Sequence, residues 1–307
     1  MIRHAFVLRA YKMNRKTTLL IAQVAVVILL LVLSDSLPAA AQSPTPQQSG
    51  STQPDVIGDD DLINADRPGL ADSSSVVGAK RLQIESGIQL EFSRPPGIRE
   101  HTLFIPTLLR IGISSRWEAR IEGNTFTRTS DFEVTGTTKR FSGLAPISLG
   151  FKYNIQDSEG VRHPSLGAIV RIFPKWGKSD FRAHHLTGDL RLSADWDFAP
   201  KLSLNPNVGV GLYEDGRGNA FAAGLFAITL NYLPSKRLNP FIDLGLQAPQ
   251  EKKGLTSVIV DAGVAYIVGR NLQLDVSIGA GARGLIPSYR FISCGVSFRS
   301  NVARHGK

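Results

Sequence analysis

The chain has 307 residues, of which 42% are hydrophobic and 20% charged, and its formal net charge is +9. The single cysteine, Cys294, excludes an intramolecular disulfide framework, so an exported domain must be stabilised in another way. About four of the nine net positive charges lie in the first 41 residues. If this segment is removed on export, the remaining chain is only mildly basic, and its charge no longer argues for nucleic-acid binding.

Residues 1–41 have the pattern of a cleaved secretory signal peptide. Basic residues precede the apolar run 19–33, and Ala39-Ala40-Ala41 supplies the small residues of a cleavage site. The run is shorter than the about 20 apolar residues that span a bilayer. We therefore expect cleavage before Gln42, with an uncleaved anchor as the alternative; Met13 precedes a complete signal by itself and is an alternative start to Met1.

Residues 42–79 show no hydrophobic periodicity. Residues 42–54 are polar and rich in proline, which predicts a flexible linker, and residues 55–79 are first acidic and then rich in serine and glycine. We expect this region to cap or plug the domain that follows, with Asp66 and Arg67 as the residues that would dock; the alternative is a disordered leader.

From residue 80 to 300 the chain repeats one pattern, a segment of about ten residues in which apolar side chains alternate with polar or tiny ones, followed by a turn. The segments are 81–92, 103–113, 117–127, 145–155, 166–172, 186–198, 202–213, 221–232, 238–247, 257–268, 271–283 and 289–299, with 131–139 read as a polar loop. This predicts an all-β protein, a transmembrane antiparallel up-and-down β-barrel of about twelve strands, followed by a basic tail, 301–307.

Loop lengths and aromatic residues orient the predicted barrel. Connections after odd strands are mostly longer than those after even strands, which places both termini in the periplasm. Six aromatic residues fall at the periplasmic ends of their strands, where a ring meets both lipid and water: Trp117, Tyr153, Trp196, Tyr232, Tyr266 and Phe298. We expect the outer membrane of a Gram-negative bacterium, with outer-membrane lipid and the barrel-assembly machinery as partners.

At the start of the barrel, Asn64-Ala65-Asp66-Arg67-Pro68-Gly69 and the strand Leu82-Gln83-Ile84-Glu85-Ser86-Gly87 carry a family resemblance. The sequence resembles the outer-membrane transporters named for the MetA pathway of phenol degradation, over about residues 61–300. The resemblance implies a channel or facilitator for small, aromatic solutes. One departure is the end of the last strand, where Phe298 is followed by Arg299-Ser300 and the basic tail instead of ending the chain.

Charged residues occupy the inward phase of the predicted strands. They are Arg81, Glu85, Glu91, Glu118, Arg120, Glu122, Arg171, Asp189, Arg191, Asp195, Asp243, Asp261, Asp275 and Arg283. Charges beside a low-dielectric wall must be paired or hydrated. The pattern therefore indicates either a lumen joined by salt bridges, or a polar path along which a solute moves between acids and arginines.

Three motif matches do not fit their context. Gly279-x-Gly281-x-x-Gly284 lies in a predicted strand with no following helix to bind a pyrophosphate, and Gly177-Lys178-Ser179 has no glycine at the spacing of a phosphate loop. His184-His185 has no third ligand evident in the sequence, so we predict no metal and no cofactor.

Together with the resemblance, the sequence favours a monomeric or weakly oligomeric channel or transporter for passive uptake or efflux of small, aromatic or hydrophobic solutes, and not an enzyme. Two other classes remain as alternatives. Outer-membrane phospholipases place a serine and a histidine on the outside of a barrel, and His184 has the outward phase for this role. A structural or adhesive barrel with a blocked lumen is the other.

Overall fold

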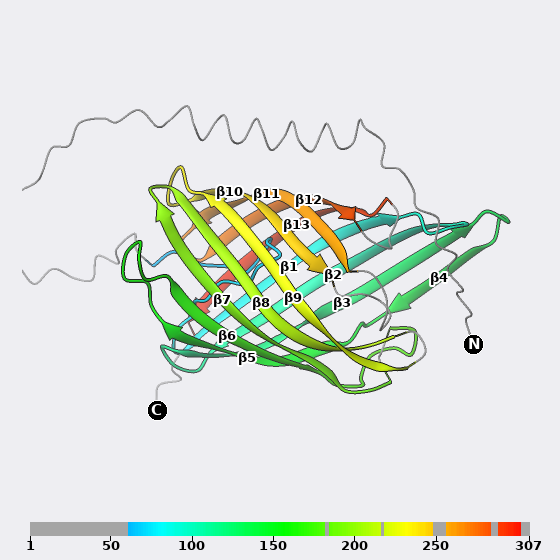
Figure 1. Ribbon diagram of the computed structural model, residues 1–307, viewed down its shortest axis with the longest axis horizontal. Helices are drawn as coiled ribbons and strands as arrows, with labels where there is room; N and C mark the ends of the chain where they lie inside the picture. Colours follow the sequence, from blue (N-terminus) through cyan, green and yellow to red (C-terminus); the bar gives the residue numbers. More distant parts are fainter. Residues whose placement is uncertain (1–60, 182–183, 216–217, 248–255, 284–287, 302–307) are drawn as a thin grey trace, which may run out of the picture. The chain divides into compact units, whose positions relative to one another are not determined.

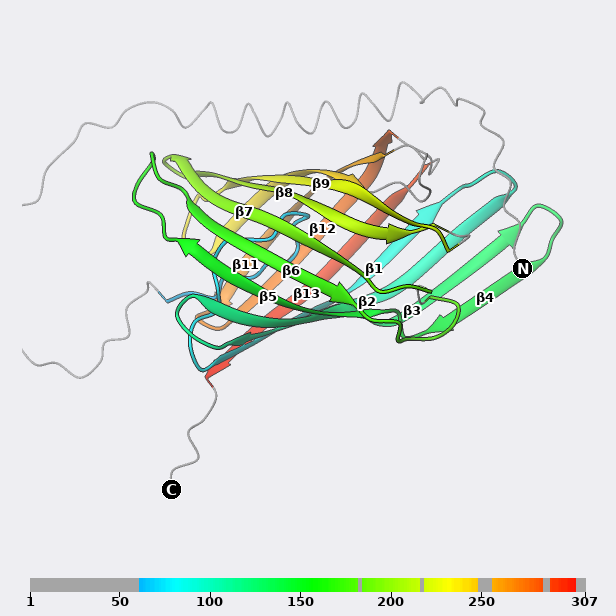
Figure 2. The same ribbon diagram turned by 60° about the horizontal axis from the view of Figure 1, so that its bottom comes forward.

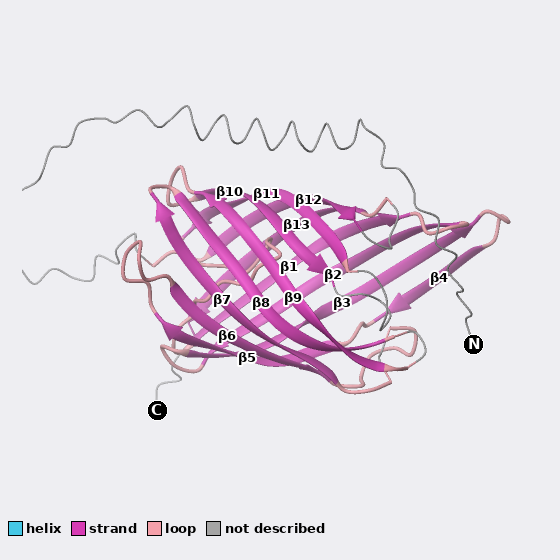
Figure 3. Cartoon of the chain, in the orientation of Figure 1, coloured by secondary structure: helices cyan, strands magenta, loops and turns pink. Residues whose placement is uncertain are grey.

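The computed structural model describes residues 61–181, 184–215, 218–247, 256–283 and 288–301. The predicted signal peptide, residues 42–60 of the predicted linker and residues 302–307 of the tail lie outside the described residues. The described part belongs to one compact unit, Asp59–Lys307, and Figure 3 shows that its regular structure consists of strands. No helix among these residues is long and apolar enough to cross a membrane.

One sheet contains all the described strands. They are β1 (Arg81–Ser93), β2 (Ile98–Gly112), β3 (Trp117–Glu133), β4 (Thr138–Gly143), β5 (Ile147–Gln156), β6 (Ser165–Phe173), β7 (Thr187–Ala199), β8 (Leu202–Glu214), β9 (Ala220–Tyr232), β10 (Leu238–Gln247), β11 (Ser257–Gly269), β12 (Leu272–Arg283) and β13 (Arg290–Asn301). Neighbours in the sheet are antiparallel, and the strands cross the long axis obliquely (Figure 1).

The sheet closes because β1 pairs with β2 on one side and with the last strand, β13, on the other. β4 and β5 share a single place in the ring: β5 pairs with the first half of β3 and β4 with the second half. The result is a closed barrel of twelve strand positions, as the sequence pattern predicted. Closure removes the sheet edges along the ring, and only the short β4 keeps an unpaired side among the described strands.

The prediction of a loop at 131–139 is wrong. β3 continues to Glu133 and turns into β4, and β2 begins at Ile98 instead of at residue 103. β3 contains a β-bulge at Thr125, which has no partner in the register between β2 and β3, and the outward positions beyond it include the polar residues Arg128 and Ser130. One extra residue exchanges the two faces of a strand, so the alternation changes phase and the second half of β3 resembles a polar loop.

Burial in the barrel is inverted relative to a soluble protein. The side chains of Glu85 and Lys152 are fully buried, whereas Ile278 is 60% exposed and Phe151 is 53% exposed. An outward apolar band around a polar interior is the arrangement of a transmembrane barrel, in which lipid covers the outside. The protein is therefore an outer-membrane-type barrel, and its polar residues lie in an enclosed lumen.

The six aromatic residues named above lie at one end of the barrel, which we call the aromatic rim. Trp117 begins β3, and the others lie near the ends of β5, β7, β9, β11 and β13, which antiparallel pairing brings to the same end. Trp117 faces Tyr153 across β3 and β5, with ring centroids 4.6 Å apart. We call the opposite end the far rim.

Candidate functional site

Residues 61–79, which we call the leader, lie inside the barrel (Figure 2). Both ends of the leader are at the aromatic rim. There Asp61 forms an ion pair with Arg81 at 2.8 Å, and the N–H of Lys80 donates to the carbonyl of Gly112 at 3.0 Å. Between these ends the leader reaches across the lumen, where the N–H of Leu70 donates to Asp243 on β10 at 2.7 Å.

The carboxylate of Asp66 lies among three buried cations. Arg110 on β2 and Arg120 on β3 are direct cross-strand partners, and Lys152 extends from β5. The carboxylate oxygens of Asp66 form ion pairs with the guanidinium of Arg120 at 2.5 Å and with the ammonium of Lys152 at 2.9 Å. A guanidinium nitrogen of Arg110 lies 3.7 Å away. Glu118 accepts from Arg110 at 2.9 Å and shares the remaining charge. The leader thus supplies an anion that these facing cations need.

The electrostatics of the leader acids follow from this arrangement. Burial alone would raise the pKa of Asp66, but the charges of Arg110, Lys152 and Arg120 outweigh it and hold the pKa well below its usual value. The pKa of Asp72 is also lowered, because burial is outweighed by Arg120 at 2.9 Å and Arg191 at 3.2 Å. The carboxylates of Asp66 and Asp72 are therefore ionised at neutral pH.

Arg67 anchors the leader to the adjoining part of the wall, formed by β12, β13 and β1. Its guanidinium donates to Asp275 on β12 at 3.1 Å and to Ser293 on β13 at 3.0 Å. Its backbone N–H donates to Glu85 on β1 at 2.9 Å, and its carbonyl accepts from Gln273 at 3.0 Å. A single leader residue therefore joins the last two strands to the first.

Two carboxylates face each other on the wall formed by β10 and β11. Asp243 and Asp261 are cross-strand partners, both almost fully buried. Among the described residues, neither carboxylate oxygen of Asp261 has a hydrogen-bond partner. One oxygen of Asp243 accepts from the N–H of Leu70, and the other has no partner there. Facing buried carboxylates need a proton or a cation between them. This wall is acidic, whereas the wall of β2 to β6 carries the arginines.

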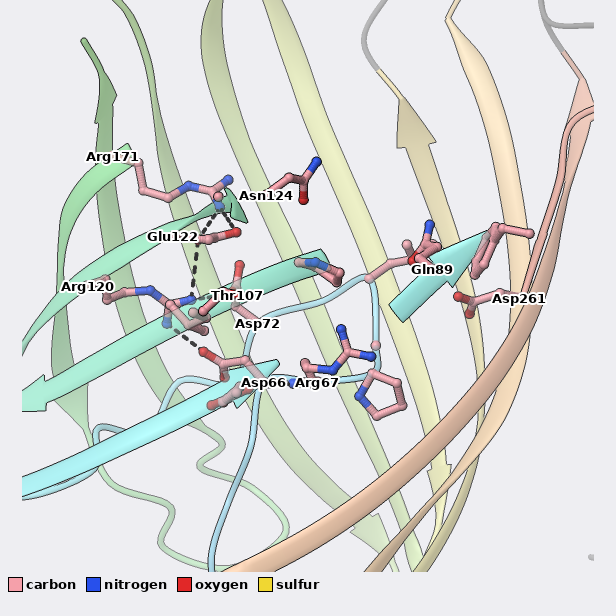
Figure 4. Close-up of a pocket in the computed structure, with 18 of the residues that line it drawn as sticks. Asp66, Arg67, Asp72, Gln89, Thr107, Arg120, Glu122, Asn124, Arg171 and Asp261 are labelled. Atoms are coloured by element: carbon pink, nitrogen blue, oxygen red, sulfur yellow. Dashed lines mark hydrogen bonds and ion pairs between the residues drawn. The ribbon is translucent and has the colours of Figure 1, made fainter. Parts of the chain in front are cut away.

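A cavity of about 310 Å³ lies against the leader, between Asp66–Asp72 and the barrel wall. Arg171 and Glu122 line one side and Asp261 the other, as Figure 4 shows. Apolar and aromatic side chains complete the lining: Pro68, Leu70, Pro106, Leu108, Ile259, Tyr289 and Phe291. The floor of this cavity is the leader itself.

The other residues proposed from the sequence occupy the wall or the rims. Arg171 contacts Glu122 and Asp189, each at 2.8 Å, and Asp195 accepts from the N–H of Ser74 at 2.9 Å. Glu91 accepts from the hydroxyl of Tyr289 at 2.6 Å. Arg191 contacts Asp72 and Asp189, and Arg81 lies at the aromatic rim. The side chain of Arg283 lies outside the described residues.

Sequence reasoning missed four charged residues of this site. Arg110 lies in the inward phase of residues 103–113, and Lys152 alternates with the apolar residues of β5, so both carried a readable signal. Asp72 lies in the leader, which has no periodicity. Arg299, noted only as a departure at the end of the last strand, donates to the carbonyl of Asp61 at 2.7 Å and so holds the start of the leader.

His184 lies in the connection before β7 and not on a strand. Its Nδ1 atom is 2.5 Å from one oxygen of Glu214, and the Nδ1 atom of His185 is 3.0 Å from the other. Both histidines are exposed. Within the described ranges, no group of three or more His, Cys, Asp or Glu side chains could hold a metal ion.

Comparisons with known proteins place the chain in a family. The family model described as "Putative MetA-pathway of phenol degradation" matches residues 65–299, and a search of curated proteins finds no match. The fold is similar to an outer membrane channel from Pseudomonas putida F1, with a TM-score of 0.58, 11% identity and coverage of 74% of this chain and 98% of that one.

Two further solved structures are more distant. The NanC porin has a TM-score of 0.45 and 11% identity, covering 69% of this chain and 98% of its own. The toluene transporter TodX from Pseudomonas putida has a TM-score of 0.41 and 11% identity, covering 73% of this chain and 91% of its own. The family model spans most of the chain, and the protein therefore belongs to the MetA-pathway phenol-degradation family of outer-membrane barrels.

Proposed function

We propose that the protein is an outer-membrane channel for small solutes, closed in this structure by the leader and opened when the leader withdraws. The observation that carries the proposal is the position of the leader as the floor of the cavity. Between Asn64 and Val77 the leader is held by wall side chains such as Arg110, Lys152 and Asp243. Its release would leave the hydrogen bonds between barrel strands intact.

The cavity fits a small solute with an apolar or aromatic body. Its volume of about 310 Å³ is at the lower end of ligand pockets, and Tyr289 and Phe291 offer rings for stacking. The phenol-degradation name of the family, and the description of its structural neighbour as an outer membrane channel, support passive movement of such solutes. Direction of movement then follows the concentration gradient.

We place the aromatic rim in the periplasm and the far rim outside the cell. The connections β7–β8 and β11–β12 at the aromatic rim are two-residue turns, whereas β6–β7 at the far rim spans 174–186. Short periplasmic turns and longer external connections are typical of such barrels. In this orientation the first strand begins and the last strand ends on the periplasmic side. One closed barrel serves as the transporting unit without a second copy.

A permanently blocked structural barrel is the main alternative, because the ion pairs around Asp66 are buried and numerous. Planar-bilayer conductance separates the two functions. The mature chain is compared with a deletion of 42–79 and, as a control, with a deletion of 42–60 that keeps the leader. We expect discrete conductance steps in the first deletion and a closed channel in the control.

The full-length double variant Asp66→Asn/Arg67→Gln repeats the test without removing any chain, and it should open the channel as well. Far-UV circular dichroism and heat-dependent mobility on gels verify the barrel in each variant. If neither the deletion nor the double variant conducts while the barrel remains intact, the channel function is wrong. An enzyme of the phospholipase type would instead show lipase activity that His184→Ala abolishes.

A further inference from the structure

The outer face of β2, β3 and β4 near the far rim carries three exposed arginines, Arg99, Arg128 and Arg140. Their outward direction follows from the register. One row of cross-strand partners runs over four strands, from Arg140 on β4 through Ser130 on β3 and His101 on β2 to Phe92 on β1. Phe92 is an exposed side chain of the lipid face. Cross-strand partners point to the same side of a sheet, so this row faces outward.

The other two arginines belong to the neighbouring rows of the same face. Arg128 lies opposite Leu103, whose partner on β1 is the exposed Leu90, and Arg99 lies opposite Phe132. The bulge at Thr125 is what turns Arg128 outward, because it exchanges the two faces of β3. We call this surface the arginine face.

An aromatic cluster lies between the arginines. The rings of Phe92 and His101 have centroids 5.1 Å apart, and His101 is at the same distance from Phe132. The arginine face thus combines cationic side chains with a compact apolar surface, a combination that matches an amphiphile and not a soluble anion alone.

The three guanidinium groups have no ion-pair or side-chain hydrogen-bond partner among the described residues. The inner face of the same strands is different, because there Lys139 pairs with Glu133 at 2.6 Å. Positive charge on the inside is compensated within the chain, whereas on the outside it is available to a partner.

The height of the arginine face matches a membrane boundary. Arg128 follows Trp117 of the aromatic rim by eleven positions, one of them the bulge. At about 3.3 Å per residue and a strand tilt of about 40°, this separation is roughly 25 Å along the barrel axis, the height of the apolar band. Arg128 therefore lies at the headgroup level opposite the aromatic rim, with Arg99 and Arg140 slightly beyond it.

We propose that the arginine face binds the phosphate groups of an outer-leaflet glycolipid, with the acyl chains against the surface of Leu90 and Phe92. Guanidinium groups bind phosphate oxygens through paired N–H donors. Three arginines on adjacent strands match a lipid that carries more than one phosphate. The choice of the outer leaflet rests on the orientation under the proposed function, but lipid binding itself requires no transport.

Native mass spectrometry of the mature protein, titrated with diphosphorylated lipid A in detergent, tests the proposal. The variant Arg99→Gln/Arg128→Gln/Arg140→Gln should bind this lipid roughly tenfold or more weakly than the wild type, because each cation near an anionic lipid contributes several-fold. The control Arg162→Gln/Lys201→Gln/Arg237→Gln removes three exposed charges from the aromatic rim and should bind as the wild type does.

The lipid series and a charge-conserving variant identify the source of binding. Monophosphorylated lipid A should bind less tightly, and phosphatidylethanolamine and inorganic phosphate much less. The variant with lysine at all three positions should fall between wild type and the glutamine variant. Equal lipid binding by the arginine-face variant and the wild type overturns the proposal, as does an equal loss in the control. Neither result depends on whether the channel conducts.

Discussion

The guanidinium of Arg67 lies against Gly295, in space that a side chain at this position would need. A Cβ atom on Gly295 would lie 2.7 Å from the Cζ atom of Arg67. The partner of Gly295 on β1 is Gly87, and a Cβ atom there would lie 2.7 Å from the Nη2 atom of Arg67. Adjacent glycines on the first and last strands therefore form a recess in the barrel wall that accepts the anchor of the leader.

The variant Gly295→Ala should expel Arg67 and open the channel. All three atoms nearest to the added Cβ belong to the flexible side chain of Arg67, so the barrel itself should tolerate the methyl group. At Gly87, by contrast, the Cβ would also collide with the backbone carbonyl of Cys294. Single-channel recording should show a higher open probability for Gly295→Ala. Gly224→Ala, whose Cβ has its nearest neighbour at 4.0 Å, is the control.

The variant Asp66→Asn should release the leader more completely. Loss of one partner from a buried ion network costs about 3–5 kcal/mol, and here it removes the carboxylate that Arg110, Arg120 and Lys152 share. With Cys294→Ser as background, a cysteine placed by Ser73→Cys should react faster with a membrane-impermeant maleimide when Asp66→Asn is added. Asp157→Asn, an exposed turn acid, should leave the rate unchanged. An unchanged rate in Asp66→Asn would contradict the role of this carboxylate.

Docking through Asp66 and Asp72 should be insensitive to pH over the physiological range. The pKa of each carboxyl is lower in the docked leader than in a free one. Their contribution to the free energy of docking is therefore complete above the ordinary aspartate pKa of about 4. It disappears only as the pH falls through the lowered pKa values of the docked carboxyls. Conductance should remain low between pH 8 and pH 5 and rise in strong acid. In Asp66→Asn the acid-induced rise should be smaller.

The variant Asp261→Asn should change the selectivity of the open channel without weakening the barrel. An amide facing Asp243 removes one of two opposed carboxylates and supplies a hydrogen-bond donor. In the Gly295→Ala background, the reversal potential in a salt gradient should indicate a lower preference for cations. Asp157→Asn in the same background controls for the change in net charge, and an equal shift there would assign the effect to overall charge.

The barrel was predictable because its physical basis is local. Lipid on one side and an enclosed lumen on the other require alternation within every strand, so residues such as Leu274 and Asp275 reveal their faces from the sequence alone. The bulge at Thr125 was not predictable, because a single extra residue leaves no compositional signal. It changed the phase of β3 and concealed the outward position of Arg128.

The wall partners of the leader could not be predicted from the sequence. Asp66 and Arg67 were proposed to dock because of their charge, but their partners depend on which wall residues the closed barrel brings together. Arg110, Lys152 and Asp275 lie on three strands far apart in the chain. No periodic pattern relates them to the leader, and Asp72 gave no signal at all because nothing in residues 55–79 alternates.

Both ends of the leader, Asp61 and the segment before Lys80, lie at the same rim. The leader is thus a loop inserted from one side, and it can leave the lumen without any chain being threaded through the pore. Tension applied to the chain before Asp61 would act first on the ion pairs of Asp61 with Arg81 and Arg299, and only then on Asp66 and Arg67. The order of bonds along the leader makes extraction a stepwise mechanical process, directed toward the aromatic rim.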